Sequence, residues 1–290
     1  MRFVAAYPIT PATELLEWMA PALARVGGTL LQAEDELASV NMIIGASYGG
    51  VPSLTATAGP GLALMAEGIG LAVAAEVPIV VVDQPKDVQG ASRVCIDDRA
   101  AMRGIAEYVV GLGHREIGLL TMRLGRHWPH GGAQSAVADP ERLTSPHFHV
   151  QRERILGVCD AMTDAGLNPD ALTVVETYEH LPSSGGAAAD VALQANPRIT
   201  ALMCTADVLA LSAMDHLRSR GIYVPGQMTV TGFDGVPEAL ARGLTTVAQP
   251  SLEKGRRAGY LLNNPPRSGI PVIEVLDTEL VRGRTSGPPA

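Results

Sequence analysis

The chain has 290 residues, 47% of them hydrophobic, and a net charge of -8. This length and apolar content suffice for a large core in more than one domain, and we expect two lobes. The net negative charge excludes a long-range attraction to phosphate backbones or anionic membranes, so neither a nucleic-acid nor a membrane partner is expected.

Short apolar runs alternate with amphipathic segments along almost the whole chain, a pattern typical of parallel sheets covered by helices on both faces. We therefore expect an α/β fold. The predicted strands, in chain order, are residues 3–6, 29–32, 53–57, 77–83, 116–121, 172–176, 201–204, 228–233 and 272–276.

Caps and apolar spacing mark the helices between these strands. Thr10 should cap the opening helix, which Pro21 should kink or end. A helix should follow the Asp97-Asp98 cap and end at Gly113, and another should run from about residue 207 to 220. Residues 123–150 show no periodicity and predict a long loop.

The cysteines and histidines predict no metal site. Three widely spaced cysteines are typical of reduced, buried residues in a cytoplasmic protein. His147 and His149 would place two imidazoles on one face of an extended segment, but neither a carboxylate nor a cysteine completes a ligand set. No window approaches the roughly 18 uninterrupted apolar residues of a membrane span.

Residues that directly follow the predicted strands are the candidates for function, because ligands of open parallel sheets bind beyond the carboxyl ends of the strands. These residues are 7–10, 33–36, 58–61, 83–86, 122–126, 205–207 and 234–237.

The first 83 residues carry three motifs in close order: 7–11, 32–36 followed by 41–48, and 55–61. With these motifs the segment resembles the pyrimidine-binding domain of thiamine-diphosphate-dependent 2-oxoacid:ferredoxin oxidoreductases, in their alpha-subunit form. The resemblance implies that Thr10 faces the oxoacid and that Glu36 protonates the aminopyrimidine ring of the cofactor. Taken alone, Glu36 also fits an exposed carboxylate in the first turn of a helix.

Beyond residue 83 this resemblance stops. The enzyme family carries a second thiamine domain marked by Gly-Asp-Gly and iron-sulfur clusters held by cysteines, whereas this chain has no Gly-Asp-Gly and three scattered cysteines. We therefore expect no enzyme activity, no catalytic residue and no bound cofactor. Thr10 and Glu36 would be vestigial cofactor-binding residues.

Residues 87–284 carry a second set of motifs, at 96–100, 111–118, 151–157, 205–210, 232–237 and 244–250. With them this part resembles the effector-binding core of the lactose/galactose-repressor family of bacterial transcription regulators. The resemblance implies two Rossmann-like lobes in a type I periplasmic-binding-protein-like architecture, joined by three crossovers. It places a small polar ligand in the cleft between the lobes. We expect the protein to be a monomer or a homodimer.

The same resemblance assigns the ligand-binding residues. Arg154 and Asp234 would hydrogen-bond the effector. Asp207 matches an acid that faces the cleft, although capping its helix explains this residue equally well. Gln249 lies at the last crossover, where a hinge role and ligand contact are both open.

The two resemblances meet near residues 77–83, the place expected for the splice. We expect the first lobe to comprise residues 1–121 and 251–270, and the second lobe residues 122–250 and 271–284. Residues 1–83 should share one parallel sheet with the strand at 116–121, because an open apolar edge would otherwise remain.

Three functional classes follow from this combination. The chain lacks the helix-turn-helix of the regulators, and the enzyme-like segment takes the place of the first four strands of their sensor lobe. This replacement of one partial domain by another predicts an engineered chimera without selected activity. The alternatives are a sensor core that binds a sugar or nucleoside-like ligand, and a thiamine-diphosphate-binding fragment without independent catalysis.

Overall fold

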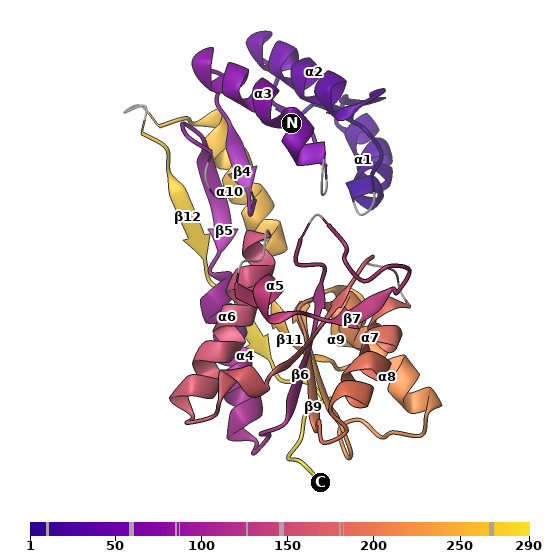
Figure 1. The fold of residues 1–290 in the computed structure, drawn as a ribbon. Coiled ribbons are helices and arrows are strands. Elements are labelled where there is room, and N and C mark those ends of the chain that lie inside the picture. Colours follow the sequence, from indigo (N-terminus) through magenta and orange to yellow (C-terminus); the bar gives the residue numbers. More distant parts are fainter. Residues whose placement is uncertain are drawn as a thin grey trace. The chain divides into compact units, whose positions relative to one another are not determined.

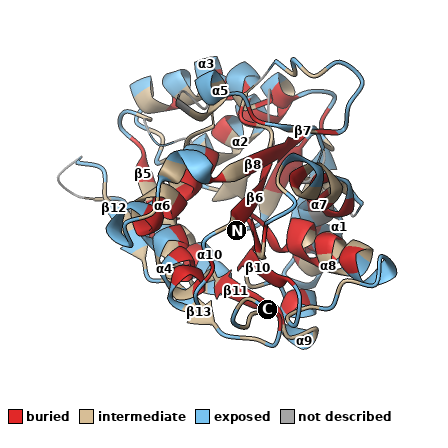
Figure 2. Cartoon of the chain, turned by 60° about the horizontal axis from the view of Figure 1, so that its bottom comes forward, coloured by how far each residue is buried: buried red, intermediate tan, exposed pale blue. Residues whose placement is uncertain are grey.

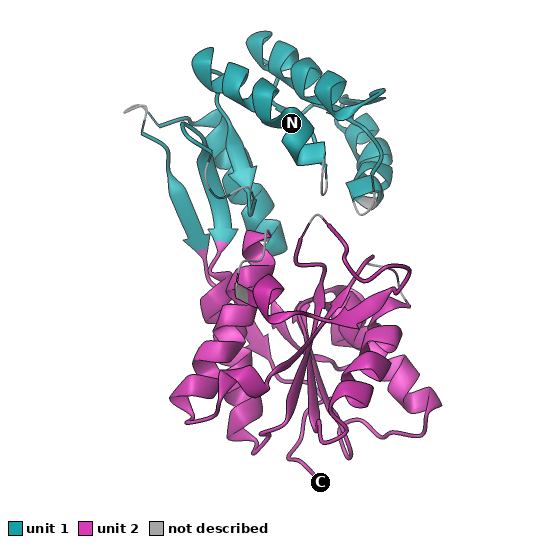
Figure 3. Cartoon of the chain, viewed as in Figure 1, with its two compact units in different colours: residues 1–95, 251–275 teal, residues 96–250, 276–290 magenta. Residues whose placement is uncertain are grey.

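The computed structural model describes residues 1–9, 12–57, 61–84, 86, 88–125, 127–144, 148–179, 181, 183–266 and 270–290. Contacts divide the chain into two compact units (Figure 3). Unit 1 comprises Met1–Cys95 and Ser251–Val275, and unit 2 comprises Ile96–Pro250 and Leu276–Ala290. The chain therefore passes between the units three times, which confirms the crossovers expected for the type I architecture.

Unit 1 contains two three-stranded sheets. Figure 1 labels the strands of the second sheet and the helices of this unit. Its first sheet has the strand order β2-β1-β3, and its second has the order β12-β5-β4. The elements are β1 (Phe3–Ala6), α1 (Ala12–Arg25), β2 (Thr29–Gln32), α2 (Glu36–Tyr48), β3 (Ser53–Leu54), α3 (Gly61–Ala74), β4 (Val80–Val82), β5 (Ser92–Ile96), α10 (Ser251–Asn263) and β12 (Ile273–Leu276).

Two small apolar clusters form the core of unit 1. Val4 and Ala6 of β1 pack with Leu16, Met19 and Leu23 of α1. The second cluster joins the buried faces of α2 and α3 and consists of Val40, Ile44, Met65 and Ala72.

The sheet predicted to join residues 1–83 with the strand at 116–121 is wrong. That strand is β6 (Ile117–Met122), which lies in unit 2, where β8 and β9 pair with its two edges. Both edges are thus occupied, so β6 cannot extend a sheet of unit 1. Val80–Val82 were expected to be buried, but they form an edge strand that is partly exposed. The lobe boundary expected after residue 121 accordingly differs from the division after Cys95.

Unit 2 is built on one seven-stranded sheet with the order β13-β11-β10-β9-β6-β8-β7. The inner strands are parallel, whereas β13 and β7 pair antiparallel at the two edges. The elements are α4 (Asp98–Gly111), β6 (Ile117–Met122), β7 (Ser135–Val137), α5 (Pro140–Thr144), α6 (His149–Asp164), a 3-10 helix (Pro169–Ala171), β8 (Thr173–Thr177), α7 (Ser184–Ala195), β9 (Ala201–Cys204), α8 (Asp207–Ser219), β10 (Thr229–Asp234), α9 (Pro237–Ala241), β11 (Thr245–Ala248) and β13 (Glu279–Val281).

Apolar side chains cover both faces of this sheet, and Figure 2 shows the buried residues gathered in its central strands. One cluster includes α4 and α6 residues such as Met102, Ile105 and Val158. The other includes Leu209 and Leu217 of α8 together with alanines of α7. Burial on both faces explains why the inner strands are nearly continuous apolar runs.

Local sequence signals correctly place several helix ends. Asp97 caps α4, where its carboxylate accepts a hydrogen bond of 2.9 Å from the Ala100 N–H. Pro21 does not end α1, which continues to Arg25. The predicted loop at 123–150 is wrong in part, because β7, α5 and the start of α6 lie within it.

The expected cap Thr10 lies outside the described residues. Among the helices that the structure describes, none combines the length and apolar character needed to cross a membrane.

Candidate functional site

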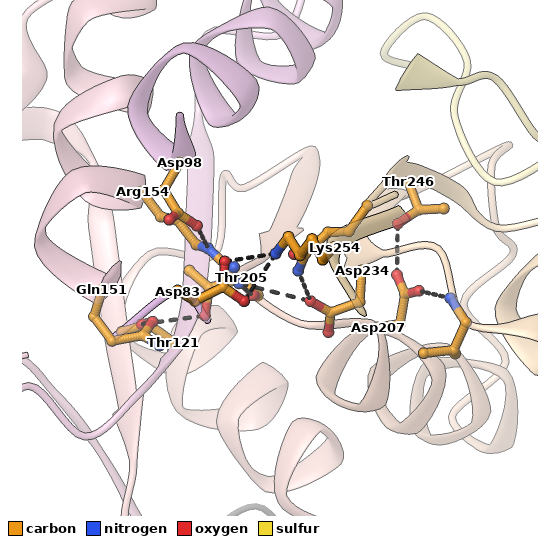
Figure 4. Close-up of polar contacts among 12 residues, drawn as sticks. Asp83, Asp98, Thr121, Gln151, Arg154, Thr205, Asp207, Asp234, Thr246 and Lys254 are labelled. Atoms are coloured by element: carbon orange, nitrogen blue, oxygen red, sulfur yellow. Dashed lines mark hydrogen bonds and ion pairs between the residues drawn. The ribbon is translucent and has the colours of Figure 1, made fainter. Parts of the chain in front are cut away.

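Several predicted residues of unit 2 gather where its parallel strands end (Figure 4). Asp234 is the last residue of β10, Gln249 follows β11, and Thr205 follows β9. Arg154 reaches this edge from α6. Because all these strands are parallel, their carboxyl ends meet at the same edge of the sheet, which is where open α/β sheets bind ligands.

Arg154 is almost fully buried and is held from three directions. Its Nε donates to Asp98 Oδ1 at 2.8 Å, and its Nη1 donates to the Thr205 carbonyl at 2.5 Å. The guanidinium lies over the ring of Phe233, 3.7 Å from the centroid. The buried charge is therefore neutralised by Asp98 and stabilised by a cation–π contact, so the guanidinium has a fixed position.

Asp234 lies opposite this guanidinium in a strained backbone conformation. Its φ is 125°, a region that side-chain-bearing residues rarely adopt. Gln249 Nε2 donates to Asp234 Oδ1 at 2.8 Å, and Arg154 Nη1 lies 3.9 Å from the same oxygen. Burial raises the pKa of Asp234 to about 6, against the opposing effect of Arg154. Strained residues cluster at functional sites, and this one presents a carboxylate beside two donors.

Asp207 is fully buried, and its carboxylate is engaged by the protein itself. Thr246 Oγ1 donates to Oδ1 at 2.6 Å, and the Val236 N–H donates to Oδ2 at 2.8 Å. The predicted capping role is wrong, because Ala206 is the N-cap of α8. Burial raises the pKa of Asp207. This carboxylate thus joins the turn after β10 to β11, and it positions Asp234.

Sequence reasoning missed a row of polar residues beneath this edge. The Thr121 hydroxyl donates to Gln151 Oε1 at 2.8 Å and accepts from the Thr205 hydroxyl at 3.2 Å. Asp98, the partner of Arg154, was interpreted only as part of a helix cap. Both Gln151 and Asp98 lie in the motifs that carried the regulator resemblance, and these motifs could have identified the two residues as part of the site.

A second polar cluster surrounds Glu176, which is fully buried at the end of β8. Arg142 approaches both carboxylate oxygens, with Nε at 2.5 Å and Nη2 at 2.7 Å. His130 Nε2 and the Leu124 N–H also lie within 3.0 Å of these oxygens. Burial works to raise the pKa of Glu176, but the bonds from Arg142, Leu124 and His130 lower it overall. The carboxylate therefore anchors the segment between β6 and α5.

Unit 1 holds the other predicted carboxyl group. Glu36 begins α2 and is 7% exposed, so the interpretation as an exposed first-turn carboxylate is wrong. The described residues offer it no hydrogen-bond or ion-pair partner. A Cβ added to Gly61, the first residue of α3, would lie 2.5 Å from Glu36 Oε1. The hydroxyl of nearby Thr57 is also buried and has no hydrogen-bond partner among the residues that the structure describes.

The predictions for Thr10 and for the histidine pair depend in part on residues that the structure does not describe. Thr10, the other expected cofactor residue, lies outside the described part of the chain, as does His147. Within the residues that the structure describes, no group of three or more His, Cys, Asp or Glu side chains could hold a metal ion.

Comparisons with known families divide the chain as the motifs do. Residues 1–92 match the family "Pyruvate flavodoxin/ferredoxin oxidoreductase, thiamine diP-bdg", and residues 106–286 match the family "Periplasmic binding protein-like domain". The chain is also similar to the 2-oxoglutarate synthase subunit KorA of Methanocaldococcus jannaschii, with 56% identity over 82 residues, 28% of this chain and 22% of that protein.

The regulator-like part has closer relatives. An HTH-type transcriptional regulator of Mycolicibacterium smegmatis is 79% identical over 215 residues, 74% of this chain and 59% of that protein. One from Mycobacterium tuberculosis is 76% identical over 73% of this chain and 58% of that protein. The chain thus spans less than two thirds of these relatives. Since they are regulators of natural organisms, the engineered origin expected from the sequence finds no support.

Solved structures match almost the full length of the chain. A LacI-family transcriptional regulator from Corynebacterium glutamicum has a TM-score of 0.75 at 26% identity, covering 98% of this chain and 85% of that one. A LacI-family regulator from Enterococcus faecium with bound ribose has a TM-score of 0.71 at 19% identity, covering 99% of both chains. The second likeness shows the fold alone.

Proposed function

Since the chain belongs to the periplasmic binding protein-like domain family, we propose that its unit 2 binds a small polar effector at the carboxyl-end edge of the sheet. Arg154, Asp234 and Gln249 would contact the effector, and Asp207 would position Asp234. The observation that carries this proposal is the strained Asp234 carboxylate beside the side chains of Gln249 and Arg154.

This arrangement suits a ligand with neighbouring hydroxyl groups. An ionised carboxylate only accepts hydrogen bonds, whereas the Arg154 guanidinium and the Gln249 amide nitrogen donate them. A pair of hydroxyls both donates and accepts, so it satisfies both kinds of group at once. Hydrogen bonds to charged groups are worth about 1.5–3 kcal/mol each, which is enough to select such a ligand.

The regulatory role of the relatives supports a sensor in preference to an enzyme. The proteins that match three quarters of the chain are named transcriptional regulators. Under this proposal the chain is an effector-sensing core, as a monomer or a homodimer. Neither operator-specific DNA binding nor oxidation of 2-oxoacids by this chain is part of the proposal.

Isothermal calorimetry of the full chain with ribose, glucose and sucrose tests the effector site. Asp234→Asn should weaken the binding of a sugar that the wild-type chain binds by about tenfold or more, because the neutral amide loses a charged acceptor. Asp215→Asn is the matched control, since Asp215 is an exposed partner of Arg242 on α8. Equal affinities of Asp234→Asn and the wild type would remove Asp234 from the site.

A second candidate function rests on Glu36 in unit 1. A buried carboxyl group without a hydrogen-bond partner is unfavourable unless a ligand supplies one. The thiamine diphosphate-binding family match suggests an aminopyrimidine as that ligand. Calorimetry with thiamine diphosphate should show binding that Glu36→Gln weakens and that Glu34→Gln, at an exposed neighbouring carboxylate, leaves unchanged. Absence of binding to the wild-type chain would exclude this function.

A further inference from the structure

The seven-stranded sheet of unit 2 carries an aromatic hollow at the end of β8. Trp128 and Tyr178 form two of its walls, with ring centroids 5.5 Å apart and ring planes inclined at 58°. The segment from Gly131 to Gln134 completes the lining, and the hollow has a volume of about 340 Å³. This volume lies within the range of small-molecule sites, at its lower end.

One hydrogen bond fixes the Trp128 ring, and a backbone hydrogen bond fixes the chain at Tyr178. The Trp128 Nε1–H donates to the Ala133 carbonyl at 2.9 Å, and the indole meets the edge of the His130 ring at a centroid distance of 4.7 Å. The Tyr178 N–H donates to the Gln134 carbonyl at 2.9 Å. The hollow therefore does not depend on a ligand to order it, which lowers the entropy cost of binding.

The buried Glu176 provides the support beneath these rings. It accepts hydrogen bonds from Arg142 of α5 and His130 of the segment after β6, and it lies two residues before Tyr178. One carboxylate thus fixes both the segment that carries Trp128 and the strand that ends beside Tyr178. Binding residues supported by such a buried contact keep their geometry better than residues on an unanchored loop.

Strand order separates this hollow from Arg154 and Asp234. Three steps lie between β10, which ends at Asp234, and β8, which ends beside Tyr178. At roughly 4.8 Å a step, the two strands lie about 14 Å apart across the sheet. A single six-membered ring spans less than half of this distance, so one ring cannot contact both places.

The shape and polarity of the hollow favour a saturated, hydroxylated ring. A flat nucleobase can lie parallel to only one of two planes that are inclined at 58°. A saturated ring instead presents C–H groups to both aromatic faces. Within the described residues, the Tyr178 hydroxyl and the Gln134 side-chain amide have no hydrogen-bond partner, so both are available to ligand hydroxyls.

We propose that this hollow is a second subsite, which binds the distal ring of a two-ring polyhydroxylated effector whose first ring contacts Asp234. Trp128 is then the specificity-determining residue that distinguishes two-ring from one-ring ligands. The proposal rests on the proposed function of the Asp234 site.

Calorimetry with glucose, sucrose and maltose tests the second subsite. Sucrose or maltose should bind more tightly than glucose. Trp128→Ala should lower the affinity for the disaccharide by about tenfold, or ~1.4 kcal/mol, and leave the affinity for glucose unchanged. Trp128→Phe should keep most of the affinity, because a ring remains. Trp18→Ala serves as the control, since Trp18 lies in unit 1 and is 69% exposed.

Fluorescence provides an independent measurement. The chain has two tryptophans, so a Trp18→Phe variant reports on Trp128 alone. Its emission should change when the disaccharide binds and remain constant with glucose.

The outcomes separate this inference from the proposed function. If Asp234→Asn weakens sugar binding but Trp128→Ala changes nothing, the second subsite is refuted and the proposed function stands. If Trp128→Ala lowers the affinity for glucose as strongly as that for the disaccharide, the second subsite is also refuted, because the hollow and the Asp234 site would then be one site. If none of the sugars binds, both proposals fail.

Discussion

Replacing Asp234 with asparagine should change how the stability of unit 2 depends on pH. Burial raises the pKa of Asp234 from 3.8 to about 6 in the folded protein. Between these values the folded protein retains a proton that the unfolded chain releases, so wild-type stability falls as the pH rises from about 4 to 6. Asparagine does not titrate, and therefore the variant lacks this loss.

The size of the effect follows from the shift and from the exposure of the side chain. At about 1.36 kcal/mol for each pH unit, the shift corresponds to about 3 kcal/mol. The side chain is 32% exposed, however, so solvent screening reduces the effect. We expect Asp234→Asn to gain about 1–2 kcal/mol of unfolding free energy relative to the wild type between pH 4 and pH 7.

Urea unfolding at the two pH values measures this change. In a Trp18→Phe background the fluorescence comes from Trp128, which lies in the same unit as Asp234. Asp215→Asn is a control of opposite sign, because the hydrogen bond from Arg242 lowers the pKa of Asp215 and its contribution is lost as the pH falls. If the stability difference between Asp234→Asn and the wild type is the same at pH 4 and pH 7, the raised pKa is refuted.

Three further predictions follow from the polar contacts. Glu176→Gln leaves the Arg142 guanidinium without its anion and should lower the unfolding free energy by about 3 kcal/mol in urea titrations, whereas an unchanged midpoint would contradict the anchoring role. In unit 1, Lys254 Nζ lies 2.6 Å from Asp83 Oδ1 with a side chain 5% exposed. Lys254→Met should therefore destabilise the chain by about 3 kcal/mol, and the additional change Asp83→Leu should restore part of the loss in a double-mutant cycle. Effector affinity should rise as the pH increases through about 6, because the ionised Asp234 is the better acceptor; calorimetry that finds no pH dependence would exclude this carboxylate from binding.

The sequence predicted most of unit 2 because its local and long-range signals agree. The Asp97 cap, the apolar face of α4 and the continuous apolar strands all specify the same parallel sheet. The motifs likewise identified Arg154, Asp234 and Gln249, which the structure brings together.

The errors arose where a property depends on distant contacts. Periodicity could not show β7, which has three residues and is specified by pairing with β8. The role of Asp207 depends on Thr246, 39 residues later in the chain. Burial of Glu36 depends on the close approach of α3 at Gly61. None of these contacts leaves a local pattern.

The strand order of unit 1 has a consequence for synthesis on the ribosome. Strand β5 lies between β4 and β12, and the segment that leads into β12 bonds to Ser92 across 180 residues. At roughly 5–20 residues per second, the second edge of β5 stays unpaired for on the order of 10–40 s after it emerges. The α10 helix, which supplies Lys254 to Asp83, emerges almost as late. Unit 1 therefore completes its folding after the sequence between its two segments has been made, and chaperones that protect open strand edges have their longest opportunity to act on this part of the nascent chain.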